Sequence, residues 1–141
     1  MGKAALINPY LDTMGGGERY FLTLAKILSE MGYEVFIEWK DLSIKNKLEK
    51  RFGINLKNIN FINDTKKGEG YDLCFWVSDG SIPLIFGKNN ILHFQVPFVN
   101  KPNLSNKIKL KFWPKVICNS NFTKEIIDKS FSISSSVRSE E

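Results

Sequence analysis

The chain has 141 residues, of which 43% are hydrophobic and 25% are charged, and its formal net charge is +5. This composition predicts one folded domain with an adequate core and argues against intrinsic disorder. No apolar run reaches the roughly 18 to 20 residues that a membrane-spanning helix needs, and no secretory signal precedes the first apolar segment, so we expect a cytoplasmic protein.

Short apolar segments of strand type alternate with segments of helical periodicity. The first strand is expected near residues 4–8 and the second near 34–39. Between them, five apolar residues recur at helical spacing and Gly32 follows as a left-handed C-cap; they are Phe21, Leu24, Ala25, Leu28 and Met31. A helix is therefore expected between these two strands.

The rest of the chain continues the alternation. A shorter helix is expected over 43–52, and one over 120–131 with Ser120 as its N-cap. Weaker helical patterns cover 81–86 and 103–113. The remaining strands are expected over 59–62, 72–77, 91–95 and 115–119. The two cysteines, Cys74 and Cys118, lie in these apolar strands, which favours buried reduced thiols over a disulfide or a metal site.

Residues 73–77 read Leu-Cys-Phe-Trp-Val and are apolar on both faces of the expected strand. A strand of this kind is typical of a parallel sheet that helices cover on each side. We therefore predict an α/β protein with a single Rossmann-like domain, in which a doubly wound parallel sheet forms a three-layer α/β/α sandwich. Ligands of such sheets bind beyond the carboxyl ends of the strands.

Gly15, Gly16 and Gly17 follow the first expected strand and open the first helix. Backbone N–H groups at such a turn, together with the positive end of the helix dipole, favour an anionic ligand. An ordinary strand–helix turn is the plainer interpretation. Glu18 in the first helical turn suits a structural role, whereas Arg19 either reaches an anion or pairs with a neighbouring acid.

Four further polar residues follow the later strands. His93 is the only histidine of the chain, and its imidazole suits hydrogen bonding or proton transfer unless it is simply packed in the core. Asp79 either orients a hydroxyl group or makes a turn with Gly80. Asn119 and Ser120 suit a capping cluster at the edge of a cleft. For the aromatic group of Trp76, Phe94 and Phe98, core packing is favoured over stacking on a sugar.

The segment 80–124 contains seven lysines and no acidic residue. Lys107, Lys109, Lys111 and Lys115 alternate with large apolar residues, a combination that suits an anionic membrane surface or a phosphorylated ligand. A solvated helix face is the simpler explanation. Nucleic acid is not expected as a partner, because the chain has none of the sequence motifs of nucleic-acid-binding modules.

A dinucleotide site is one alternative for the glycine turn. Gly15-x-Gly17 opens a helix, and Glu38 follows at the end of the second strand, where an acid holds a ribose in such sites. However, the third glycine position is Tyr20, and the loop of residues 8–17 is longer than the turn that this motif requires. A nucleotide-binding P-loop has less support still, because no glycine is followed by Lys-Ser or Lys-Thr in the required frame.

Three motifs in order carry a family resemblance: Asn8-Pro9-Tyr10 with the Gly-Gly-Gly-Glu-Arg run of residues 15–19, then His-Phe-Gln-Val-Pro at 93–97, then Val-Ile-Cys-Asn-Ser-Asn-Phe-Thr-Lys at 116–124. Together they resemble the N-terminal, acceptor-side domain of group 1 (family 4) glycosyltransferases of the GT-B type. The glycine turn is most similar to that of mannosyltransferases of lipid-linked oligosaccharide assembly. The resemblance extends from Lys3 to about Val137.

The resemblance implies a retaining hexosyltransferase that moves a hexose, such as mannose, from a nucleotide-sugar to a lipid-linked or glycan acceptor without a cofactor or metal. It implies a catalytic role for His93 and substrate-binding roles for Gly15, Gly16, Gly17, Arg19, Asp79, Asn119 and Ser120. The expected partners are the nucleotide-sugar, the acceptor and an anionic membrane surface at its cytoplasmic face.

In this family a second, C-terminal domain binds the donor and carries two glutamates spaced eight apart. No equivalent pair follows here, so we expect a domain over 1–137, a truncated or non-native tail over 138–141 and little activity without the donor-binding domain. Two alternatives stay open. One is a stand-alone Rossmann-type module that binds a phosphorylated ligand, and the other is a homodimer formed through an exposed apolar face.

Overall fold

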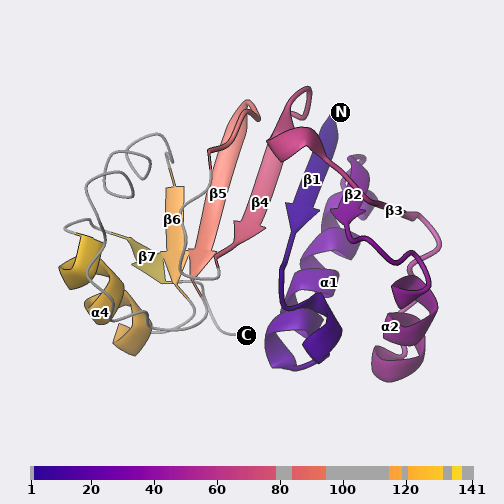
Figure 1. Ribbon diagram of the computed structural model, residues 1–141, viewed down its shortest axis with the longest axis horizontal. Coiled ribbons are helices and arrows are strands. Elements are labelled where there is room, and N and C mark those ends of the chain that lie inside the picture. Colours follow the sequence, from indigo (N-terminus) through magenta and orange to yellow (C-terminus); the bar gives the residue numbers. More distant parts are fainter. Residues whose placement is uncertain (1, 79–83, 95–114, 119–120, 132–134, 138–141) are drawn as a thin grey trace.

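The computed structural model in Figure 1 describes residues 2–78, 84–94, 115–118, 121–131 and 135–137. Seven strands form one sheet in the order β3-β2-β1-β4-β5-β6-β7, and every neighbouring pair is parallel. The strands are β1 (Lys3–Ile7), β2 (Glu34–Glu38), β3 (Ile59–Ile62), β4 (Leu73–Val77), β5 (Asn89–Phe94), β6 (Lys115–Cys118) and β7 (Ser136–Val137).

This strand order confirms the predicted Rossmann-like sheet, because it reverses direction between β1 and β4, as in doubly wound folds. All six expected strands are present, with ends that differ by at most two residues. The two-residue strand β7 was not expected. It is too short to carry a periodic pattern, and its pairing with β6 became visible only in the folded chain.

Three helices belong to the described residues: α1 (Gly16–Glu30), α2 (Ile44–Phe52) and α4 (Asn121–Phe131). They confirm the first, second and last expected helices, and Gly32 has the positive φ that was expected after α1. Two short 3-10 helices, η1 (Leu11–Thr13) and η2 (Lys66–Gly68), were not expected. None of these helices is long and apolar enough to cross a membrane.

The expected helix over 81–86 is wrong for the part that the structure describes, since residues 84–86 have no helical structure. The backbone N–H of Phe86 donates to the carbonyl oxygen of Lys67 (2.9 Å), and that of Lys88 donates to Tyr71 (3.0 Å). Pairing with the chain before β4 therefore replaces the i to i−4 bonds of a helix. The expected helix over 103–113 and the Ser120 N-cap lie outside the described residues.

The two faces of the sheet follow from the register, since paired residues of parallel strands point to the same side. On one face, strand residues such as Leu6, Ile37 and Phe75 form the largest core with Phe21 of α1 and Leu48 of α2. On the other face, Leu92, Phe94 and Cys118 pack with Ile127 of α4. Helices therefore lie on both faces, which confirms the three-layer α/β/α architecture.

The α4 face has a different cover over the first half of the sheet. There, Tyr71 and Ile85, from the two segments that flank β4, pack against Ala5, Ile7 and Cys74. The described residues of these segments are non-helical except for η2. A chain of this kind covers less of the sheet than a helix does, and an opening remains at the carboxyl ends of the strands.

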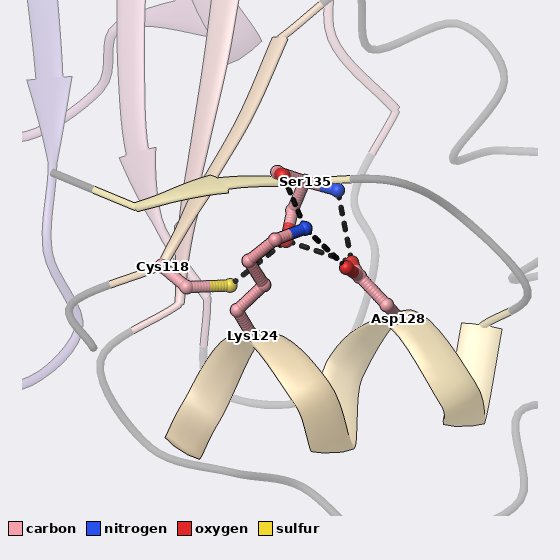
Figure 2. Close-up of polar contacts among 4 residues, drawn as sticks. All are labelled: Cys118, Lys124, Asp128 and Ser135. Carbon is pink, nitrogen blue, oxygen red and sulfur yellow. Dashed lines mark hydrogen bonds and ion pairs between the residues drawn. The ribbon is translucent and has the colours of Figure 1, made fainter. Parts of the chain in front are cut away.

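A polar cluster attaches β7 to α4 (Figure 2). The carboxylate of Asp128 accepts hydrogen bonds from the backbone N–H (2.9 Å) and hydroxyl (2.7 Å) of Ser135 and pairs with the Lys124 ammonium. Lys124 also donates to the carbonyl oxygen of Ser135 (2.6 Å), and the Ser135 hydroxyl lies 3.3 Å from the Cys118 sulfur. These contacts join α4, β6 and the start of β7, so the role of the cluster is to hold the β7 strand.

Candidate functional site

The turn between β1 and α1 lies at the carboxyl edge of the sheet, where the arrowheads of β1, β4 and β5 end (Figure 1). The amide oxygen of Asn8 accepts the backbone N–H of Tyr10 (2.8 Å), and the buried side chain of Leu11 anchors η1. Met14 then adopts a left-handed conformation with φ of 53°. This folded loop explains why nine residues separate β1 from Gly17.

The buried side chain of Glu18 holds the start of α1. Its carboxylate accepts hydrogen bonds from the Gly15 backbone N–H (3.0 Å) and from the Thr13 hydroxyl. An acid at the third helical position that reaches back to the N-cap backbone supplies half of a capping box. The structural role expected of Glu18 is confirmed. The side chain of Arg19, one residue further, is exposed.

The local structure does not account for glycine at positions 15 and 16. None of Gly15, Gly16 and Gly17 is among the residues with positive φ. A Cβ atom added at Gly16 would meet no atom within 4 Å, and one at Gly15 would meet only the Glu18 carboxylate at an ordinary contact distance of 3.5 Å. Neither backbone conformation nor packing thus requires glycine at Gly15 or Gly16, and open space lies beside the first turn of α1.

His93 lies near the end of β5 and its side chain is fully buried. The imidazole stacks on the ring of Tyr20 from α1, with centroids 5.6 Å apart and planes 24° apart. The ring of Phe75 lies 5.5 Å from it on the neighbouring strand β4. The turn of α1 that follows the glycines therefore contacts His93 on the α1 face. Asp79, Asn119 and Ser120 lie outside the described residues.

A pocket of about 420 Å³ opens at the carboxyl ends of β1, β2, β3 and β4. Nine residues line it, and we call it the edge pocket: Ile7, Asn8, Pro9, Glu38, Trp39, Lys40, Asp41, Asn63 and Trp76. Its volume falls in the range of small-molecule sites, and it lies where doubly wound sheets bind their ligands, at the reversal of strand order between β1 and β4.

The edge pocket and His93 lie on opposite faces of the sheet. Ile7 is paired with Glu38 on β2 and with Trp76 on β4, so these three side chains share one face. His93 is paired with Val77, whose side chain belongs to the α1 face. Of the predicted catalytic and substrate-binding residues that the structure describes, none lines the edge pocket, although Glu38, the acid of the dinucleotide alternative, does.

The pocket contains hydrogen-bonding groups of both kinds. Glu38 Oε1 accepts the backbone N–H and the hydroxyl of Thr65, each at 2.8 Å, which fixes the carboxylate at the pocket wall. Asn8 is 1% exposed, and its amide Nδ2 has no hydrogen-bond partner among the residues that the structure describes. An unpaired buried donor of this kind costs about 1–3 kcal/mol.

The pocket wall is more acidic than basic. Among the lining residues that the structure describes, Glu38 and Asp41 carry carboxylates and Lys40 carries the one ammonium. Hydrogen bonds from the side chain and backbone of Ser43 hold the pKa of Asp41 below its ordinary value, so Asp41 is ionised at neutral pH. The wall therefore disfavours a phosphate group, in contrast to the N-terminal turn of α1.

From the sequence, a role was expected for only one of the two tryptophans of the pocket. Trp76 was expected in the core, and the structure places it both against the two smaller hydrophobic clusters and at the pocket wall. Trp39 received no functional interpretation. The sequence signal that points to both is position: Trp39 directly follows β2, and Trp76 is the residue before the end of β4.

Neither cysteine suits nucleophilic chemistry. Burial, reinforced by the charge of Glu38, raises the pKa of the Cys74 thiol to about 12. Burial also raises the pKa of Cys118. Both thiols are buried and free, as the sequence predicted. Among the residues that the structure describes, no group of three or more His, Cys, Asp and Glu side chains forms a possible metal site.

The fold and the edge pocket define a Rossmann-like α/β domain with a candidate ligand site at its carboxyl edge. Comparison of the chain with protein-family models, with curated proteins and with solved structures finds no match.

Proposed function

We propose that this chain is the acceptor-binding half of a retaining glycosyltransferase of GT-B type, which moves a hexose from a nucleotide-sugar to a lipid-linked or glycan acceptor. The observation that carries the proposal is the glycine turn at the carboxyl edge of a doubly wound sheet. Gly15 and Gly16 are required there neither by φ nor by packing. A need for close approach of a ligand to the backbone accounts for them.

In this proposal, the N–H groups of the first turn of α1 bind a phosphate of the donor or of a lipid-linked acceptor, and Arg19 adds a positive charge. The helix dipole favours such a group at this end. Asp79, Asn119 and Ser120 follow β4 and β6 in the sequence and, by the resemblance, bind the sugar hydroxyls. A second domain supplies most of the donor site, so this chain has little activity by itself.

His93 has the catalytic role in the proposal because the resemblance places it near the reacting sugar. Its complete burial against Tyr20 and Phe75 means that contact with a substrate requires the neighbouring residues to move. If His93 transfers a proton, a substitution that keeps the aromatic contacts but removes the ring nitrogens should abolish sugar transfer. If His93 only packs in the core, the same substitution should leave sugar transfer intact.

A nucleotide-binding domain is the second candidate, favoured by Glu38. This acid ends β2 and lines a pocket next to the β1–α1 loop, which is where a ribose-binding acid lies in dinucleotide sites. Three features weigh against it. Tyr20 occupies the third glycine position, η1 lengthens the loop, and Glu38 Oε1 is already bonded to Thr65.

The experiment is a transfer assay on the natural gene product that contains this chain together with any further domain. Purified protein is incubated with labelled GDP-mannose or UDP-glucose and a lipid extract. We expect label to enter the lipid fraction with retention of the anomeric configuration. The substitution Gly16→Ala should strongly reduce the transfer while the protein stays folded. Failure of the natural protein to transfer sugar from either donor would contradict the proposal.

A further inference from the structure

The edge pocket has no part in the phosphate contacts proposed for the glycine turn, and its lining has a chemistry of its own. Among the described lining residues, Glu38, Asp41 and Lys40 give an excess of one negative charge. Such a wall disfavours phosphates and favours neutral groups that both donate and accept hydrogen bonds. Hydroxyl groups have this property.

The fixed polar groups of the pocket match hydroxyl groups in particular. Thr65 engages Glu38 Oε1 through two hydrogen bonds and thereby orients the carboxylate, which is half-buried and still has capacity to accept. Asn8 lies in the lining with a buried amide nitrogen that lacks an acceptor among the described residues. Its oxygen is occupied by the Tyr10 N–H, so the amide is held in one orientation.

The apolar part of the lining consists mainly of Trp39 and Trp76, both half-buried, together with Ile7 and Pro9. The two tryptophans come from β4 and from the residue after β2, on either side of β1. Indole rings offer large rigid apolar faces, and they suit ligands with one apolar and one polar side. A pyranose ring has C–H groups on its faces and hydroxyl groups around its rim.

We propose that the edge pocket binds a neutral sugar ring, with its hydroxyl groups hydrogen-bonded to Glu38 and Asn8 and its C–H face against Trp39 or Trp76. The assignment of this ring to the acceptor glycan rests on the proposed function, whereas the binding itself does not. The ring and the phosphate of an acceptor then have separate sites at one edge of the sheet.

The test is an NMR titration of the 141-residue chain labelled with ¹⁵N. The probes are the methyl glycosides of mannose, glucose and N-acetylglucosamine, followed by uridine diphosphate, adenosine and inorganic phosphate. The indole N–H signals of Trp39 and Trp76 are assigned through Trp39→Phe and Trp76→Phe. We expect saturable shifts of these two signals and of the Asn8 side-chain amide with at least one glycoside, and none with phosphate.

Two variants test the polar contacts. Glu38→Gln keeps an acceptor for the Thr65 hydrogen bonds and should bind the glycoside about tenfold more weakly, since a hydrogen bond to a charged group is stronger than one to a neutral amide. Asn8→Ala should weaken binding as well. The control is Asn58→Ala, an exposed amide beside a smaller pocket next to the start of β3, which should bind like the wild type. Amide spectra of each variant report folding.

Three results would overturn the inference. The first is that no glycoside causes a saturable shift of the two indole signals, and the second is unchanged glycoside affinity in the folded Glu38→Gln variant. The third is that uridine diphosphate or adenosine causes larger shifts than the glycosides. The last result would make the pocket a nucleotide site. Glycoside binding without sugar transfer by the natural protein would reject the proposed function and retain this inference. Sugar transfer by the natural protein without glycoside binding at the edge pocket would reject this inference and retain the proposed function.

Discussion

The ring of Tyr20 lies against the imidazole of His93, with centroids 5.6 Å apart and planes 24° apart. Tyr20 follows the glycine turn by one helical turn, and His93 is the second-to-last residue of β5. The contact therefore joins the N-terminal end of α1 to the carboxyl end of a central strand. It also places both on the face of the sheet opposite to the edge pocket.

Substitutions at His93 should distinguish a catalytic role of this residue from a role in core packing. His93→Ala removes a buried ring and should lower the free energy of unfolding by about 2–4 kcal/mol. His93→Phe keeps a ring between Tyr20 and Phe75 but has no nitrogen atoms, so we expect it to be more stable than His93→Ala and yet to lose most of the transfer activity of the natural protein. Urea unfolding and the transfer assay measure the two quantities. Full transfer activity in the His93→Phe variant would mean that His93 has a packing role and no catalytic role.

Gly16→Ala should separate a ligand-binding glycine from a structural one. The position has helical backbone and free space for a Cβ atom, so stability should stay equal or rise by up to about 1 kcal/mol. Ligand approach to the backbone should be blocked and transfer should fall. The control is Gly53→Ala, which follows α2 with φ of +64° and should destabilise the chain by about 1 kcal/mol. Normal sugar transfer by the Gly16→Ala variant would show that the glycine turn does not bind the substrate.

Replacement of Glu18 should loosen the start of α1. Glu18→Ala leaves the Gly15 N–H and the Thr13 hydroxyl without their shared acceptor, and we expect a loss of about 1–3 kcal/mol in the free energy of unfolding. Glu30→Ala at the exposed C-terminal end of the same helix is the matched control and should change stability by less than about 0.5 kcal/mol. Equal effects of the two substitutions would contradict the capping role.

The Asp128 cluster should make stability depend on pH in the acid range. Burial alone would raise the pKa of Asp128, but hydrogen bonds from Lys124 and Ser135 outweigh it and lower the pKa below the ordinary value of 3.8. A lowered folded-state pKa means that the stabilisation is present above 3.8 and is lost as the pH falls through the folded-state pKa.

Asp128→Asn should therefore cost about 1–3 kcal/mol near neutral pH, with a smaller difference from the wild type at pH values below the folded-state pKa. Thermal unfolding over a pH series measures the difference. Glu125→Gln, an exposed residue of the same helix, should follow the wild-type curve at every pH. A constant gap between Asp128→Asn and the wild type across the series would disprove the linkage.

Membrane attachment is proposed from the lysine-rich segment of residues 80–124, in which Lys107, Lys109 and Lys111 lie outside the described residues. Replacing Lys107, Lys109 and Lys111 with Gln should weaken binding to anionic vesicles at low salt, because each basic residue near such a surface contributes about 1 kcal/mol. Co-sedimentation with phosphatidylserine vesicles measures the effect, and added salt should reduce wild-type binding. A control with Lys45, Lys47 and Lys50 of α2 replaced by Gln should bind normally. Equal binding by both triple variants would refute the idea.

Local patterns in the sequence were enough to predict the class of fold. The apolar strands with intervening helical periodicity predicted a parallel sheet, and the apolar run Leu73–Val77 predicted cover on both faces. The structural role of Glu18 and the positive φ of Gly32 were also predicted. Each of these features depends on residues within one or two turns of each other, and such short-range interactions are encoded directly in spacing.

The edge pocket was decided only by tertiary structure. Asn8, Glu38 and Trp76 are far apart in the sequence, and it is the register of β2 and β4 on β1 that gathers them at one edge of the sheet. The failure of residues 84–86 to form a helix has the same origin, since their backbone groups pair with residues before β4. Sequence determined which elements form, because propensity and periodicity are local. Register and long-range pairing determined which side chains meet, because they depend on the packing of the whole sheet.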